Sequence, residues 1–172
     1  EIISTLQTIA SQTALAVRNA VLFNQRSELV DGLSYINDSV QNVLFNPNRD
    51  AALLAACQTA LAITHANRAA IYLLQADGAA LRLESSVGLS AAYQDRFRSV
   101  PFQPGLYAAG PRVIADALKH PDSAPAVAEG IAAYVEMPLL STGEIRGLLT
   151  ACHPVPHTYT LTELYLLETL AN

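Results

Sequence analysis

The chain has 172 residues, of which 51% are apolar and 15% are charged, and its formal net charge is −5. This composition argues against an intrinsically disordered chain, because it supplies enough apolar surface for a folded core. The basic residues are scattered singly, which argues against a nucleic-acid or anionic-membrane surface. The apolar runs at 51–62 and 134–140 are too short to span a membrane. We therefore expect a cytoplasmic protein in which Cys57 and Cys152 are reduced thiols.

Residues 1–46 predict one long helix of the coiled-coil type. From Ile2 to Phe45 there is no proline, and the only glycine is Gly32. A seam with 3-4 spacing, interrupted once in the middle, is formed by Ile3, Leu6, Ala10, Thr13, Val17, Ala20, Val30, Leu33, Asn37, Val40 and Leu44. A second stripe beside it contains Ile9, Ala16, Phe23, Leu29, Ile36 and Val43. Two adjacent stripes are typical of a helix that contacts both its own domain and a partner.

The length of this helix predicts a homodimer. If continuous, it would span roughly 65 Å, whereas the compact remainder of the chain has an expected radius of gyration of about 14 Å. The helix would then extend beyond the domain, and its seam would need a second helix to cover it. In the alternative interpretation, the chain folds back at Gly32 into a monomeric hairpin. Asn37 on the seam either sets the register of the pair or is exposed.

Residues 47–172 predict an α+β domain with an antiparallel sheet of about six strands and flanking helices. Pro47 ends the first helix. We expect helices over 49–67, 90–97, 124–131 and 160–172, and strands over 68–75, 80–87, 112–116, 134–140 and 145–153. Asp77-Gly78 predicts a tight turn between the first two strands. Proline and glycine concentrate between 100 and 125, which predicts loops there.

The two ends of the chain resemble each other. Residues 6–11 and 167–172 match in residue type at every position. The simplest interpretation is a module that recurs, with residues 1–46 ending the preceding copy. Chance similarity between two amphipathic helices is the alternative.

Several short stretches of the globular part, taken in order, resemble the GAF domain family. They are Ala69-Ala-Ile-Tyr-Leu-Leu74 with Asp77-Gly78, Val87-Gly-Leu89, Pro104-Gly-Leu106, Val113-Ile-Ala-Asp116, Glu136-Met-Pro-Leu139 with Gly143-Glu-Ile-Arg-Gly-Leu-Leu149, and Leu161 through Ala171. The resemblance implies a GAF/PAS-like fold in residues 47–172. It also implies that residues 1–46 are a signalling helix, and that the chain is an input domain of a bacterial two-component protein such as a sensor histidine kinase.

The resemblance further implies a small-molecule pocket between one face of the sheet and the loops of residues 101–134. The candidate ligand-binding residues are Tyr72, Glu84, Ser86, Tyr107, Asp116, Tyr134 and Glu136. Alternation along strands lets only about half of such a set face inward. Asp116 is equally interpreted as a cap of the following loop, and Tyr72 and Tyr134 as core rings. The Asn-Lys-Phe-Asp-Glu signature of cyclic-nucleotide-binding members is missing, so neither cGMP nor cAMP is expected.

Two features suggest alternative functions: a segment that is shorter than in most members of the family, and a Cys-His pair. Residues 101–113 are too short for the helix that most family members place there, which favours a degenerate domain that acts only as a dimerisation spacer. A bilin or haem sensor is the remaining alternative, since bilin-binding members attach their chromophore near a Cys-His pair. Here Cys152-His153 ends the last strand, on a different element.

We expect no metal site, no cofactor and no enzymatic activity in this part of the protein. Cys152, His153 and His157 could supply three of the four ligands that zinc usually takes, but neighbours on a strand point to opposite faces. A core thiol and a surface imidazole are the expected roles. The sequence contains no phosphate-binding loop, no nucleophile elbow and no zincin motif. Any kinase activity would belong to another part of the protein.

Overall fold

The computed structural model describes residues 18, 22, 26–34, 36 and 48–172. From residue 48 onward the structure has six strands and four α-helices, in the order α2, β1, β2, α3, β3, β4, α4, β5, β6, α5. Three short 3-10 helices lie at Pro104–Tyr107, Ala117–Lys119 and Pro121–Ser123. The helices are α2 (Arg49–Thr64), α3 (Ala91–Arg96), α4 (Ala124–Ala128) and α5 (Leu161–Ala171). The strands are β1 (Arg68–Leu74), β2 (Ala80–Val87), β3 (Ser99–Pro101), β4 (Arg112–Ile114), β5 (Ala133–Ser141) and β6 (Glu144–His153).

The strands form one sheet in the order β3-β2-β1-β6-β5-β4, and every neighbouring pair is antiparallel. This confirms the predicted antiparallel α+β fold. The predicted strands all form: the strand over 80–87 has the predicted bounds, and the ends of the others differ by at most two residues. The strand β3 was not predicted, because it has three residues and ends at Pro101 in a segment rich in loop-forming residues.

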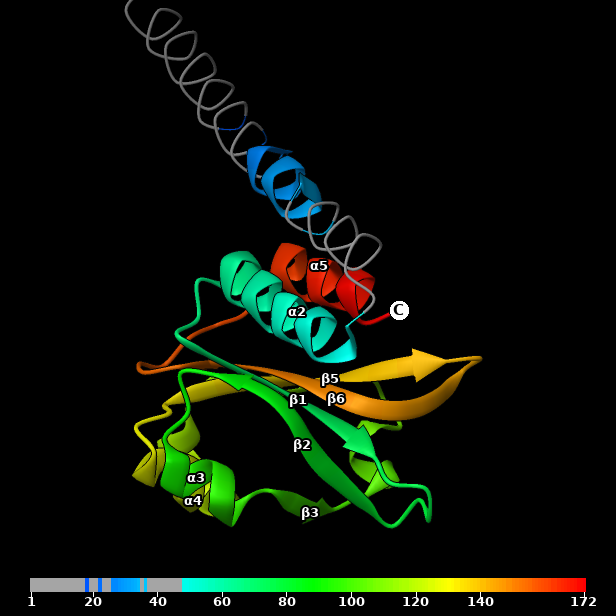
Figure 1. Cartoon of the computed structure of the whole chain (residues 1–172). Coiled ribbons are helices and arrows are strands. Elements are labelled where there is room, and N and C mark those ends of the chain that lie inside the picture. Colours follow the sequence, from blue (N-terminus) through cyan, green and yellow to red (C-terminus); the bar gives the residue numbers. More distant parts are fainter. Residues whose placement is uncertain (1–17, 19–21, 23–25, 35, 37–47) are drawn as a thin grey trace, which may run out of the picture.

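Helices α2 and α5 lie together on one face of the sheet (Figure 1). The main core lies beneath them and includes Ile71 and Leu149 from the sheet and Leu167 from α5, all exposed by 1% or less. Local signals explain the start of each helix. The Asn48 side chain accepts a hydrogen bond from the Asp50 amide, and Thr160 forms a capping box with Glu163 at the start of α5.

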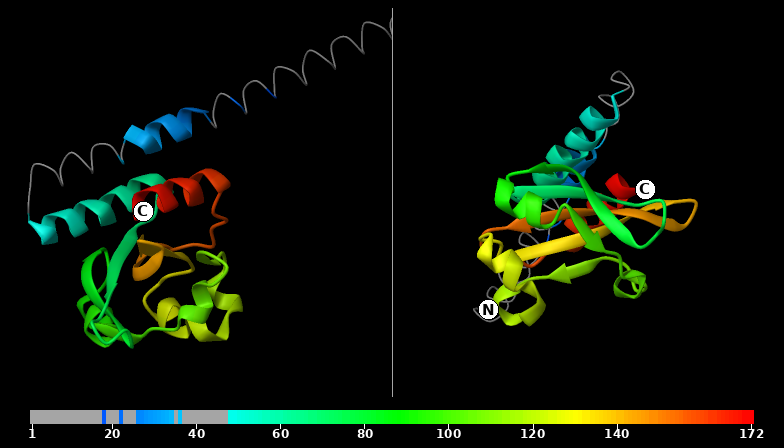
Figure 2. Two further views of the ribbon diagram at one scale, coloured as in Figure 1. Left: turned by 90° about the vertical axis from the view of Figure 1, so that its right-hand side faces the viewer. Right: turned by 60° about the horizontal axis from the view of Figure 1, so that its bottom comes forward.

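Residues 26–34 form one helix that packs on α5 (Figures 1 and 2). The helix passes through Gly32, so the chain does not fold back at this glycine. A Cβ at position 32 would overlap the side chain of Leu166. The glycine therefore lets the Leu166 side chain of α5 lie directly against the backbone of this helix.

The two predicted stripes of this helix have different surroundings. Leu29 and Ile36, from the second stripe, pack against the main core. Val30 and Leu33, from the seam, are 57% and 43% exposed. The remaining predicted dimer positions, Ile3, Leu6, Ala10, Val17, Asn37, Val40 and Leu44, lie outside the described residues. In the part of the chain that the structure describes, no helix has the length and apolar character needed to cross a bilayer.

The imidazole of His153 is buried, not on the surface as predicted. Alternation along β6 places it on the face covered by α2 and α5, where it is 6% exposed. The chain that follows β6 folds back over it, so that the ring of His157 stacks on it at 3.9 Å and the ring of Tyr159 meets it edge-on at 5.5 Å. His157 also contacts the Glu163 carboxylate at 3.0 Å.

This burial predicts that His153 destabilises the fold in acid. Burial, reinforced by the nearby His157, lowers the pKa of His153 below its ordinary value. The unfolded chain then binds more protons than the folded one as the pH falls through about 6.5, so stability is lost. We expect His153→Phe, which keeps a ring in the stack, to lose less unfolding free energy between about pH 7 and pH 5 than the wild type does. Urea denaturation at each pH measures this, and equal losses in both proteins would contradict it.

Candidate functional site

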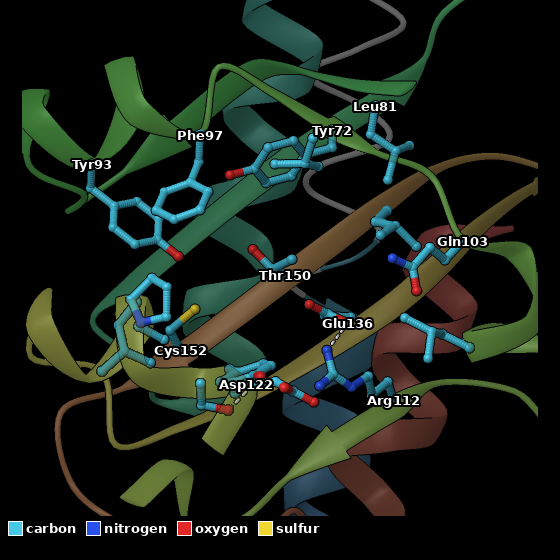
Figure 3. Close-up of a pocket in the computed structure, with 18 of the residues that line it drawn as sticks. Tyr72, Leu81, Tyr93, Phe97, Gln103, Arg112, Asp122, Glu136, Thr150 and Cys152 are labelled. Atoms are coloured by element: carbon cyan, nitrogen blue, oxygen red, sulfur yellow. Dashed lines mark hydrogen bonds and ion pairs between the residues drawn. The ribbon is translucent and has the colours of Figure 1, made fainter. Parts of the chain in front are cut away.

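A cavity of about 250 Å³ lies on the face of the sheet opposite α2 and α5 (Figure 3). The sheet forms its floor, and α3, β3, β4 and α4, with the loops between them, form its walls. Its lining includes Tyr72, Leu81, Tyr93, Phe97, Gln103, Leu106, Tyr107, Arg112, Asp122, Ser123, Ala126, Ile131, Tyr134, Glu136, Leu148, Thr150 and Cys152. This is the position that the family resemblance implied for a ligand pocket.

The floor is built by alternation along the two central strands. On β6, Leu148, Thr150 and Cys152 face the cavity at every second position, while Leu149 and Ala151 face the main core. The register places Cys152 opposite Tyr134 of β5. The Tyr134 hydroxyl forms a buried hydrogen bond of 2.9 Å with Ser123, which ties the loop before α4 to the floor.

One wall is aromatic and belongs to α3. The rings of Tyr93 and Phe97 lie 4.5 Å apart, because residues four apart are neighbours on a helix. Ser90 caps α3 through the Tyr93 amide, and the Glu129 carboxylate accepts hydrogen bonds from both the amide and the hydroxyl of Ser90 at 2.6 and 2.7 Å. These bonds hold the wall in place against the C-terminal end of α4.

The opposite wall carries an ion pair. The Glu136 Oε2 atom accepts hydrogen bonds from the Tyr107 hydroxyl at 2.9 Å and from the Arg112 guanidinium at 3.3 Å. Both charged side chains are largely buried, with exposed fractions of 19% for Glu136 and 25% for Arg112. Burial opposes the charge on Arg112, yet Glu136 and the nearby tyrosines raise the pKa of this side chain overall. The guanidinium is therefore firmly charged.

Three further groups of the lining, Cys152, Tyr72 and Tyr107, stay protonated near pH 7. Burial raises the pKa of the Cys152 thiol to about 12 and that of the Tyr72 hydroxyl to about 12. Burial, with the Glu136 charge, also raises the pKa of Tyr107. A thiol with so high a pKa is a poor nucleophile, because the thiolate is the reactive form.

Four of the seven candidate ligand-binding residues line this cavity: Tyr72, Tyr107, Tyr134 and Glu136. The other three do not. The Glu84 carboxylate faces α2 and forms ion pairs with Arg49 of that helix at 3.1 Å and with Arg82 of its own strand at 2.6 Å. Ser86 lies in a separate surface hollow. Asp116 caps the turn that follows it by accepting a hydrogen bond from the Leu118 amide, as one of the two interpretations expected.

The sequence reasoning missed the aromatic wall and the basic partner of Glu136. Tyr93 and Phe97 were visible as an i, i+4 aromatic pair on a predicted helix, and Thr150 and Cys152 as alternating positions of a predicted strand. Arg112 gave no such signal. It enters the cavity because the short strand β4 pairs with β5 and places Arg112 directly opposite Glu136.

The Cys-His pair is divided between the two faces of the sheet. Cys152 lines the cavity, while His153 packs beneath the helical layer. Among residues 48–172 and the described positions before them, no group of three or more His, Cys, Asp or Glu side chains is arranged to hold a metal ion.

Comparison with known proteins identifies the family. The GAF domain profile matches residues 48–172, and the chain belongs to the GAF domain family. No curated protein matches the sequence.

Solved structures share the fold at low sequence identity. A GAF domain from a phosphoenolpyruvate-protein phosphotransferase of Coxiella burnetii is 20% identical over 83% of this chain and 89% of its own, with a TM-score of 0.68. A free methionine-R-sulfoxide reductase from Neisseria meningitidis, in complex with its substrate, is 20% identical over 83% and 85%, also at 0.68. A domain assigned to a two-component sensor histidine kinase of Sinorhizobium meliloti is 24% identical over 69% and 82%, at 0.60.

Proposed function

We propose that this GAF domain is the sensory input domain of a bacterial two-component signalling protein, and that it binds a small molecule in the cavity beneath α3. The observation that carries the proposal is the cavity itself. Aromatic rings border it, and its lining holds an ion pair and two tyrosine hydroxyls without a partner among the described residues, which is the usual composition of a ligand site.

The signal would pass from the cavity to the helices through β6. Cys152 faces the cavity, and its neighbour His153 packs against the chain that leads into α5. The helix at residues 26–34 rests on α5 through Gly32 and Leu166. A ligand that binds one arrangement of these layers more tightly than another would shift the population of helix arrangements.

Transmission of the signal beyond this domain would then require two copies of the chain, paired through their helices. Val30 and Leu33 leave an apolar strip exposed on the helix that contacts α5, and a homodimer through residues 1–46 would cover it. In this proposal the domain is cytoplasmic, and it regulates a histidine kinase and its phosphorelay without catalysing a reaction itself. The protonated state of Cys152, the only thiol in the cavity lining, supports a binding role rather than a reductase role.

The alternative function, a dimerisation spacer that binds no ligand, was suggested by the shortness of the segment at 101–113. The segment Pro104–Tyr107 forms a single 3-10 turn, and yet it closes one side of the cavity by placing Leu106 and Tyr107 against it. The shortened segment therefore does not by itself remove the site. A bilin sensor is less well supported, because a cavity of about 250 Å³ is smaller than those that hold drug-sized ligands.

A thermal-shift screen with small metabolites tests the binding proposal. A ligand at 100 times its dissociation constant adds about 2.7 kcal/mol of stability, which corresponds to a rise of about 8 °C in Tm. Gln103→Trp is the matched control, because the new side chain would fill the cavity from its edge. The proposal fails if no compound stabilises the wild type, or if the same compounds stabilise Gln103→Trp equally.

A further inference from the structure

The size of the cavity limits what it can hold. A dry protein cavity of about 150 Å³ accepts a benzene molecule. The present cavity, at about 250 Å³, has room for one ring with a substituent or for two small fused rings. Larger ligands would require the walls to move.

The walls select a flat molecule. Five aromatic side chains border the cavity: Tyr72, Tyr93, Phe97, Tyr107 and Tyr134. Aromatic side chains pack best against other rings in offset or edge-to-face contact. Among the described residues, the hydroxyls of Tyr72 and Tyr93 have no hydrogen-bond partner, and both side chains reach into the cavity (Figure 3). Each hydroxyl can donate to, or accept from, a heteroatom at the rim of a bound ring.

The ion pair selects the polar edge of that molecule. Both hydrogen bonds to Glu136 end on Oε2, so Oε1 is a free acceptor within the described part of the chain. Arg112 uses one nitrogen for this bond, and its other N–H groups remain free donors. A free acceptor beside free donors is complementary to an N–H group beside a carbonyl oxygen. An anionic ligand would be opposed by Glu136 and by Asp122, a further carboxylate of the lining, and a cationic group at this edge would be opposed by Arg112. A neutral polar edge therefore fits the pair best.

Resting on the proposed function, we propose that the cavity binds a neutral, planar molecule of one or two rings that carries an amide edge, with its carbonyl oxygen on Arg112 and its N–H on Glu136. The rings of Tyr93 and Phe97 would pack against the flat body of the ligand. The charges and the hydrogen-bonding groups of the site thus specify the chemical class of the ligand.

Four small probes, each built on a single benzene ring, separate the possibilities. Benzamide has the amide edge, benzoate is its anionic counterpart, benzamidine its cationic counterpart, and N,N-dimethylbenzamide lacks the N–H donors. Binding to the whole chain is followed by NMR of leucine methyl groups. Leu81 and Leu148 line the cavity, whereas Leu149 and Leu167 lie in the core on the other face of the sheet and report non-specific effects.

Benzamide is expected to bind with a dissociation constant of about 1 mM, in keeping with its few atoms. The other three probes are expected to bind at least about tenfold more weakly, since each leaves a buried polar group unpaired or opposed. Glu136→Gln keeps the size of the side chain and removes its charge, so Arg112 is no longer balanced. In that variant the preference is expected to reverse, with benzoate binding more tightly than benzamide.

The outcomes separate this inference from the proposed function. If benzoate, benzamidine or dimethylbenzamide shifts the Leu81 and Leu148 methyls as strongly as benzamide, the site binds small molecules but the inference is wrong. If no probe shifts them, the inference is also wrong, and the metabolite screen alone decides the proposed function. The ranking of the four probes on the wild type decides the matter even if Glu136→Gln does not fold.

Discussion

Replacing Gly88 with alanine is expected to lower the free energy of unfolding by about 3 kcal/mol. Gly88 follows β2 with a φ of 77°, a conformation that residues with a side chain rarely adopt. An added Cβ would also overlap the backbone carbonyl of Asn67, the residue directly before β1. Both the strain and the overlap destabilise the folded state, and the backbone of a central strand cannot move aside without disturbing the sheet.

Gly78→Ala is the matched control for this prediction. Gly78 has a similar φ of 70°, but an added Cβ there would meet nothing within 4 Å. This variant carries the strain alone and is expected to cost about 1 kcal/mol. Denaturant unfolding of both variants measures the difference. Equal losses would show that the contact with Asn67 is not the reason for the glycine at position 88.

Leu33→Glu is expected to weaken the proposed homodimer by about 10- to 100-fold in dissociation constant. Leu33 is 43% exposed in the single chain, so the substitution should leave the monomer fold intact. In a paired helix the same position would be covered by the partner, and a buried unpaired carboxylate is costly. Sedimentation velocity over a range of concentrations measures the change.

Leu118→Glu is the control for the dimer prediction. Leu118 is 72% exposed and lies in the turn after β4, away from the helix of residues 26–34. Leu118→Glu makes the same change in charge and apolar area as Leu33→Glu, but at a position outside the proposed interface. A wild-type chain that sediments as a monomer at high concentration, or a dimer that both variants weaken equally, would contradict the proposed pairing.

The strands and helices of this domain could be predicted because their signals are local. The turn at Asp77-Gly78, the cap at Ser90 and the alternation along β6 each depend on residues that are close in sequence. The same local reasoning missed β3. Its pairing with β2 is made by three residues, and no periodicity can be read from so short a strand.

The site was harder to predict because it depends on contacts between distant segments. Glu136 could be named from the sequence, but its partners Tyr107 and Arg112 lie 29 and 24 residues away. Glu84 was assigned to the wrong face of the sheet. A bulge in the β1–β2 pairing, next to Tyr72, interrupts the simple alternation that would relate Glu84 to Ser86, and α2 supplies Arg49 as a partner on the other side.

The surroundings of His153 show the same limit. Alternation correctly separates it from Cys152, but only the return of the chain after β6 brings His157 and Tyr159 over its ring. Nothing in the local sequence indicates that a later segment covers the His153 side of β6. Burial that comes from a later segment is a property of the assembled fold.

In the proposed function, a ligand in the cavity changes how two copies of the helix lie against each other. The most direct test attaches a spin label to Ser34→Cys, an exposed position on this helix, and measures the distance between the labels of the two copies. Cys57 and Cys152 are buried, with pKa values raised by that burial to about 11 and about 12, and should stay unlabelled. With the compound that stabilises the protein most in the thermal screen, we expect that distance to shift by about 1–2 Å or more. An unchanged distance at saturating compound, or the absence of any signal between copies, would contradict it.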